Sequence, residues 1–133
     1  MLLSPEQARQ ALSRVDPARL LAGWPVGLRD GALLALLAAG LNAEEISELH
    51  ASAISMDRGH LIVAVRRYGI TWRAEMPMDI GGRLLAWLTE RRLWATDTPL
   101  FTGPQGPLSY FAVYKVLERY GHRQPAQAPR RRT

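Results

Sequence analysis

The run from Leu28 to Ala39 (LRDGALLALLAA) constrains the fold more than any other part of the chain. Leucines at positions 33, 34, 36 and 37, together with four alanines, make this segment apolar on nearly every side of a helix. A helix of that kind has to be covered by other elements in most directions. The sequence therefore predicts a central, buried helix over 28–39, which Gly40 ends in the left-handed conformation.

The other predicted helices each begin at a residue whose side chain can accept a hydrogen bond from the first helical turn. These N-cap residues are Ser4, Asn42, Asp79 and Ser109. At the first two, a capping box is completed by Gln7 and Glu45. We expect the first helix to end near Asp16-Pro17, residues 17–27 to be an irregular connection, and the last helix to cover 110–120 and close at Gly121.

Between the third and fourth predicted helices the apolar period changes from that of a helix to that of a strand. A turn signal at 57–59 precedes a predicted strand over 60–65, residues 66–69 form a hairpin connection, and 71–78 return as a second strand. Residues 95–108 read as a long loop. The expected fold class is α+β and mostly α, a helical domain (1–121) with a small antiparallel sheet of two to three strands.

The composition limits the kinds of function that need consideration. The 133 residues contain no cysteine, which excludes disulfides, thiolate metal sites and thiol nucleophiles. No metal-ligand spacing, phosphate-binding glycine motif or Ser/His/Asp pattern is found, so we expect no cofactor, metal or small-molecule substrate. The longest apolar run, 32–41, is too short to span a membrane, and the first residues do not resemble a secretory signal. A cytoplasmic location is the resulting expectation.

The net charge of +5 is concentrated at one end of the chain. The segment 122–133 has four arginines and no acidic residue, and it lacks the apolar side chains that a packed structure requires. We expect this segment to be a disordered basic tail, which either binds DNA nonspecifically or only increases solubility. Residues 1–121 are close to neutral.

Several motifs occur in an order and at a spacing that resemble the N-terminal half of the catalytic domain of tyrosine recombinases (the phage integrase family). They are LSPEQ at 3–7, Arg29-Asp30 before Ala32-Leu33-Leu34, Gly40-Leu41, Glu45-Ile46, Leu49, Ile54, Met76-Pro77-Met78, Pro99-Leu100-Phe101 and Gly106-Pro107-Leu108-Ser109. The resemblance extends over residues 3–121. It implies a truncated fold of the recombinase catalytic type.

The catalytic groups of that family are missing from the matching positions. Asn42 occupies the place of the first catalytic arginine, and a neutral amide does not stabilise a phosphorane as a guanidinium does. The predicted hairpin has no lysine to act as general acid. The family's His-x-x-Arg box and nucleophilic tyrosine follow the 109–121 helix, and this sequence ends before them. We therefore expect no catalysis, and Asn42 to act as an N-cap.

Two groups of residues are candidates for contact with duplex DNA. The predicted hairpin and its flanks carry Arg58, His60, Arg66, Arg67 and Arg73, with no acidic residue between positions 58 and 74. These side chains could bind phosphates, or they could be the solvated charges that protect a strand edge from aggregation. Tryptophans 24, 72, 87 and 94 are expected in the core, although Trp72, near the hairpin tip, could instead be exposed.

The second group lies on the predicted 110–120 helix. It consists of Tyr110, Tyr114, Lys115 and Arg119, which would read bases only weakly. In the alternative interpretation Phe111, Val113 and Val116 simply pack this helix against the core.

Two functions of different classes remain. The first is a catalytically inactive, recombinase-like protein that binds duplex DNA as a regulator, an architectural factor or a modulator of a full-length recombinase. The second is a protein-interaction module or homodimer that does not bind DNA. A gene remnant without a selected role is a third possibility. A single concave surface shared by Arg66, Arg67, Arg73, Lys115 and Arg119 would favour DNA binding, whereas scattered positions would favour protein interaction.

Overall fold

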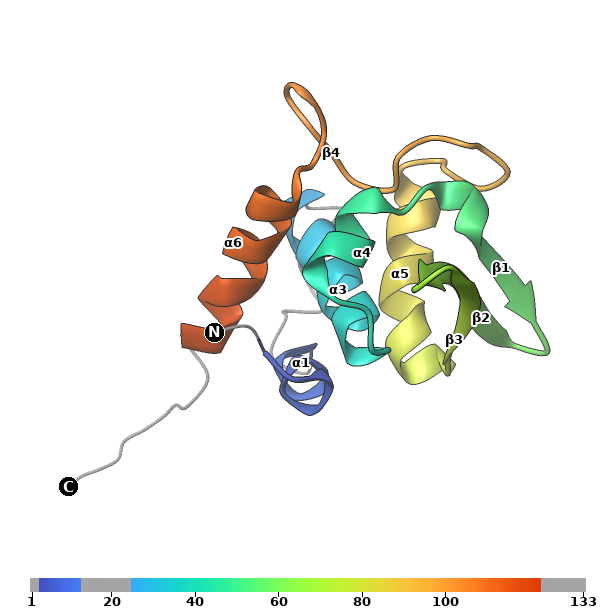
Figure 1. The fold of residues 1–133 in the computed structure, drawn as a ribbon, viewed down its shortest axis with the longest axis horizontal. Coiled ribbons are helices and arrows are strands. Elements are labelled where there is room, and N and C mark those ends of the chain that lie inside the picture. Colours follow the sequence, from blue (N-terminus) through green and yellow to red (C-terminus); the bar gives the residue numbers. More distant parts are fainter. Residues whose placement is uncertain (1–2, 13–24, 123–133) are drawn as a thin grey trace.

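A computed structural model describes residues 3–12 and 25–122 of the chain. Within these residues the fold is α+β and mostly α, as predicted (Figure 1). The helices are α1 (Pro5–Leu12), α3 (Pro25–Ala38), α4 (Ala43–Glu48), α5 (Met78–Glu90) and α6 (Tyr110–His122), with a short 3-10 helix η1 (Ala51–Ala53). The strands are β1 (Ile54–Asp57), β2 (His60–Arg67), β3 (Ile70–Met76), β4 (Thr102–Gly103) and β5 (Gly106–Pro107).

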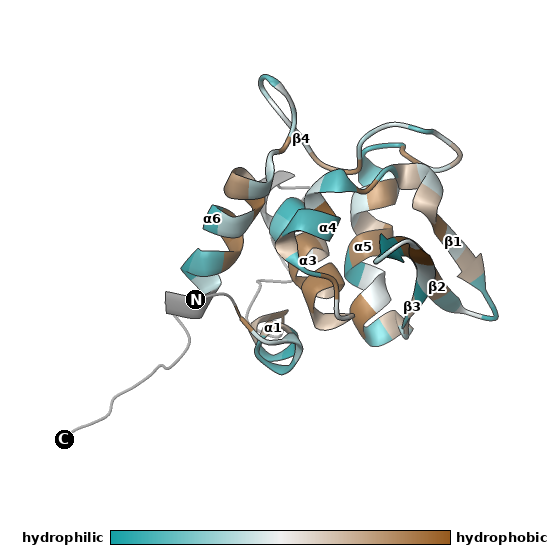
Figure 2. Cartoon of the chain, in the orientation of Figure 1, coloured by the Kyte–Doolittle hydropathy of each residue, from teal (hydrophilic) through white to brown (hydrophobic). Residues whose placement is uncertain are grey.

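Helix α3 is the centre of the molecule, as its apolar sequence predicts. Its residues 32–36 are fully buried, and α1, α5, α6 and α4 pack around it. Figure 2 shows the apolar sides of these helices turned toward one another. The helix begins at Pro25, so the prediction that 17–27 is irregular is wrong for its last three residues, since proline suits the first turn of a helix. Positions 13–24, which include Asp16, Pro17 and Trp24, lie outside the described residues.

The connection from α3 to α4 follows the predicted chemistry. Gly40 has φ +106°, and the amides of Gly40 and Leu41 donate to the carbonyls of Leu37 (3.0 Å) and Leu36 (3.2 Å), the pattern of a Schellman cap. The side chain of Asn42 then accepts from the Glu45 amide (2.8 Å), and the Glu45 carboxylate accepts from the Asn42 amide (3.0 Å). This capping box confirms the predicted role of Asn42, and an equivalent box joins Ser4 and Gln7 at α1.

Two predicted helix ends are wrong. Asp79 does not cap α5, because the helix begins at Met78 after an extended Pro77, which leaves Asp79 in the first turn, ion-paired with Arg9 of α1 (2.5 Å). Gly121 does not close α6, since the helix continues through it to His122. The Ser109 hydroxyl accepts from the Ala112 amide (3.1 Å), which confirms the predicted cap at the other end of α6.

Strands β1, β2 and β3 form an antiparallel sheet in that order. The two connections are two-residue turns, Arg58-Gly59 and Tyr68-Gly69, in which both residues have positive φ. The inner face of the sheet, with Leu61, Val63 and Met76, is buried against α5. The outer face carries the alternate residues of β2 and β3. They are Ile62, Ala64, Arg66, Thr71, Arg73 and Glu75.

The predicted loop over 95–108 contains more structure than expected, since β4 and β5 pair within it. Leu100 and Phe101 are buried, and the Trp87 indole donates to the Leu100 carbonyl (2.9 Å). Trp87 is therefore a core residue, as predicted, whereas Trp94 is 37% exposed, which contradicts its predicted core position. Trp72 is half-buried. None of the helices in the described segments is long and apolar enough to cross a membrane.

Candidate functional site

Arg67, a predicted phosphate contact, is half-buried, and its guanidinium is bonded to the body of the protein. Its guanidinium binds the Glu45 carboxylate through two hydrogen bonds (2.7 and 2.6 Å) and donates to the Gly40 carbonyl (3.1 Å). It also lies over the Trp72 ring at 4.4 Å. The hydrogen bonds from Arg67 lower the pKa of Glu45, and those to Glu45 raise the pKa of Arg67. Arg67 therefore connects the hairpin to the start of α4.

The strand geometry keeps Arg66 and Arg73 on one face of the sheet and leaves Arg58 apart from them. Arg66 and Arg73 are exposed and lie diagonally to each other on the outer face, because Arg66 is opposite Thr71 and Arg73 is opposite Ala64. The Arg66 guanidinium donates to the Gly69 carbonyl (3.2 Å). Arg58 lies in the β1–β2 turn, at the opposite end of β2 from Arg66.

Acidic side chains offset part of this basic surface. His60 is within 2.7 Å of the Glu75 carboxylate, across the pair formed by β2 and β3. Asp57 is exposed and lies opposite His60 in the sheet. The absence of acidic residues between 58 and 74 in the sequence thus does not make the folded hairpin purely basic.

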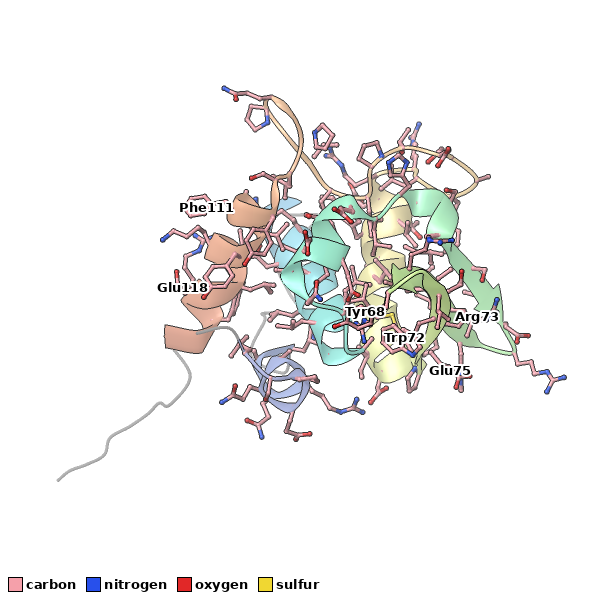
Figure 3. All side chains as sticks on the ribbon, viewed as in Figure 1. Tyr68, Trp72, Arg73, Glu75, Phe111 and Glu118 are labelled. Carbon is pink, nitrogen blue, oxygen red and sulfur yellow. The ribbon has the colours of Figure 1, made fainter. Side chains whose placement is uncertain are left out.

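The second predicted group lies on α6, on the other side of the molecule from the sheet. Helix α6 packs against α4 and α3, whereas the sheet packs against α5 (Figure 1). Lys115 and Arg119 are exposed, and the Lys115 ammonium pairs with Glu118 (3.5 Å). Figure 3 shows Phe111 and Glu118 of α6 far from Arg73 and Glu75 of β3. The predicted DNA-binding residues do not form one surface.

Large apolar side chains are exposed where β2 and β3 join and at the start of α6. Tyr68 and Ile70, at the β2–β3 turn, are 97% and 70% exposed. On α6, Tyr110 is 51% and Phe111 66% exposed, so Phe111 does not pack against the core as the alternative interpretation required. Val113 and Val116 are buried, as that interpretation expected.

A shallow groove separates the starts of α4 and α6. It has a volume of about 350 Å³, and the rings of Tyr110 and Tyr114, 6.0 Å apart, lie along it. The opposite wall is formed by residues 42–44, so Asn42 borders the groove while its side chain caps α4. Aromatic rings beside a concave surface favour contact with another molecule through apolar surface.

The sequence search for a Ser/His/Asp arrangement missed three residues that the fold brings together. The Ser52 hydroxyl donates to one Asp97 oxygen (2.7 Å), and His50 Nδ1 lies 3.2 Å from the same oxygen. Both contacts lower the pKa of Asp97. A catalytic triad requires a hydrogen bond between serine and histidine, and here both residues bind the exposed carboxylate instead. The cluster fastens the loop after α5 to η1.

Asp30 is the one buried charged residue in the described segments, and it joins α6 to α3. The Tyr120 hydroxyl donates to one Asp30 oxygen (2.5 Å), and the Arg29 guanidinium donates to the other (3.0 and 3.1 Å). Among residues 3–12 and 25–122, no group of three or more His, Asp or Glu side chains is placed to hold a metal ion.

No family model, curated protein or solved structure matches this chain. The likeness to tyrosine recombinases therefore depends on the motifs of the sequence alone.

Proposed function

We propose that this protein is a non-catalytic interaction module that associates with a second copy of itself. The observation that carries the proposal is the exposure of Tyr68, Ile70, Tyr110 and Phe111 on a body that is otherwise well packed. Exposed aromatic and aliphatic groups that gather at particular places on a folded surface are typical of contact sites.

The arrangement of charges also supports an interaction role over a DNA-binding one. Arg67, the most central residue of the predicted phosphate contact, is bonded to Glu45. The remaining basic side chains divide between the outer face of the sheet (Arg66 and Arg73), the β1–β2 turn (Arg58) and α6 (Lys115 and Arg119). A phosphate-binding surface requires several cations that face the same backbone.

The role of Asn42 also supports a non-catalytic protein. Asn42 is fully used as an N-cap, and a cap of this kind stabilises a helix by about 1 kcal/mol relative to alanine. In the resemblance to recombinases this is the position of a catalytic arginine, and here its residue serves the start of α4.

Sedimentation velocity over a range of protein concentrations tests the proposal. We expect the unmodified chain to associate reversibly. Tyr68→Ser with Ile70→Thr and Tyr110→Ser with Phe111→Ser each remove one of the two exposed apolar patches, and we expect the pair that lies in the contact surface to weaken association without lowering thermal stability. Met56→Ser removes another exposed apolar side chain (50%), from β1, and serves as the control. A chain that stays monomeric at every concentration would refute the proposed function.

Binding of duplex DNA is a second candidate function. It is favoured by Arg66 and Arg73, which are both exposed on the outer face of the hairpin, and by the resemblance to recombinases. Binding through so few arginines would be weak and strongly dependent on salt.

A further inference from the structure

Strand β3 forms an unpaired edge of the sheet. It pairs with β2 on one side, and no strand of the described chain lies on its other side. In an antiparallel ladder alternate residues direct their N–H and C=O groups toward each neighbour. The two-residue turn closes on the pair Arg67↔Ile70, so the backbone groups of Thr71, Arg73 and Glu75 point away from β2 and are available to another strand.

We propose that β3 pairs antiparallel with β3 of a second copy, about a two-fold axis at Ala74, to form a continuous six-stranded sheet. This inference rests on the proposed self-association and specifies its surface and alignment. With the axis at Ala74, Arg73 forms a hydrogen-bonded pair with the partner's Glu75, and Glu75 forms the same pair with the partner's Arg73. The residues that hydrogen-bond between the two copies are thus those with unused backbone groups.

The charges of β3 match this alignment. Arg73 and Glu75 are both exposed on the outer face of the sheet, where Glu75 also contacts His60, and Figure 3 shows them on the same strand. Directly opposite residues of unlike charge stabilise a strand pair, whereas like charges destabilise it. The two-fold axis creates two opposite-charge pairs.

The apolar residues in and next to β3 agree with this alignment. An axis at Ala74 brings Ile70, which is 70% exposed, to the end of the partner's β3, where Met78, the first residue of α5, is 40% exposed. It also places the half-buried Trp72 opposite the partner's Met76 on the inner face. Contacts across the axis would remove the exposed parts of Ile70, Trp72 and Met78 from water. Pro77, which has no N–H and follows Met76, would end the pairing where β3 ends.

The other symmetric alignments of this edge are less favourable. An axis at Arg73 or at Glu75 would put two like charges directly opposite each other. An axis at Trp72 would leave Glu75 without an opposite charge. The β1 edge has only four residues, so it offers a shorter surface than the seven residues of β3.

A charge-exchange experiment tests both the surface and the alignment. Arg73→Glu alone places glutamates at 73 and 75 of each copy, and Glu75→Arg alone places arginines there. We expect each variant to associate about tenfold more weakly than the unmodified chain, because attraction becomes repulsion at two pairs. An equimolar mixture of the two variants restores both opposite-charge pairs, so we expect it to form a mixed dimer with near-original affinity.

Fluorescence-detected sedimentation, with one variant labelled, measures the mixed dimer directly. Arg66→Glu is the control, because Arg66 is on the same outer face but in the central strand β2. It should leave association unchanged, and circular dichroism melting establishes that every variant is folded. If the unmodified chain associates but the single variants associate equally well, or if the mixture forms no dimer, the β3 alignment is wrong while self-association stands. A monomeric unmodified chain would overturn both.

Discussion

Glu45 makes two structural contacts, with Asn42 and with Arg67, and only the first could be predicted from the sequence. Its backbone amide and carboxylate form the capping box with Asn42, a local pattern that three-residue spacing predicts well. Its carboxylate also binds Arg67, which is 22 residues away in the sequence. No local pattern reports such a distant pair. The alternation of β2 does place Arg67 on the same face as the buried Val63 and Val65, and this was the signal that a search for basic clusters overlooked.

The ion pair of Glu45 and Arg67 should make the stability of the fold depend on pH. Because Arg67 lowers the pKa of Glu45 in the folded protein, the ionised carboxylate stabilises the fold above the unfolded value of about 4.3. That contribution disappears as the pH falls through the lower folded pKa. We expect Glu45→Gln, which can still cap α4, to lower the melting temperature at pH 7, and expect the difference to shrink between about pH 5 and about pH 3.

Thermal melting followed by circular dichroism at pH 7, 5 and 3 measures this difference. Glu48→Gln is the matched control, since Glu48 is an exposed residue of the same helix and should have little effect at any of these pH values. A difference for Glu45→Gln that stays constant with pH would mean that the ion pair with Arg67 does not stabilise the fold.

At the scale of the elements, the β2–β3 turn holds an unfavourable residue. Tyr68 has φ +55° in a two-residue turn, a conformation that asparagine and glycine adopt far more readily than an aromatic residue. Because its side chain is almost fully exposed, packing does not compensate for the strain. We expect Tyr68→Asn to stabilise the protein by about 0.5–1 kcal/mol, measured by urea unfolding.

Tyr68→Phe tests whether the turn conformation is the cause. It retains the aromatic ring in the same conformation and should leave the free energy of unfolding unchanged. If Tyr68→Asn brings no stabilisation relative to Tyr68→Phe, the turn does not strain its first residue. If it stabilises the fold and also weakens self-association, Tyr68 is present for contact and not for folding.

Most helices and strands could be predicted because their apolar period and caps are local properties. The central helix, the Gly40 ending and the small sheet all follow from residues within a few positions of one another. The errors occur where two local signals compete. Pro77 and Asp79 both suit the start of α5, and the extended backbone at Pro77 decides the boundary. The pairing of β4 with β5 depends on two-residue strands that leave almost no period in the sequence.

At the scale of the whole molecule, the predicted site failed to assemble for a topological reason. The basic residues of the hairpin are close in sequence, but strand alternation sends Arg67 to the inner face and Arg66 to the outer one. Lys115 and Arg119 belong to a helix that packs on α3 and α4, away from the sheet. Which elements pack together is a long-range property, and the sequence alone did not determine it.

The two candidate functions make opposite predictions for DNA binding. Fluorescence anisotropy with a labelled duplex, over several salt concentrations, measures the binding of three chains. They are the unmodified chain, a hairpin variant (Arg66→Ala with Arg73→Ala) and a tail variant (alanine at positions 130–132). If the fold is an interaction module, we expect the hairpin variant to bind like the unmodified chain. The tail variant should lose most of its affinity, and the slope of log affinity against log salt should fall by about three, since roughly one counterion is released per arginine contact.

The reverse result would favour the DNA-binding candidate. Loss of affinity and of about two units of salt slope in the hairpin variant would mean that Arg66 and Arg73 contact phosphates from the outer face. Such contact is still compatible with a paired β3 edge, because the outer face of a six-stranded sheet would present two copies of each arginine to one duplex. Arg66 lies outside the proposed β3 pairing. Measuring both association and DNA binding on the Arg66→Ala chain therefore distinguishes a loss of phosphate contact from a loss of self-association.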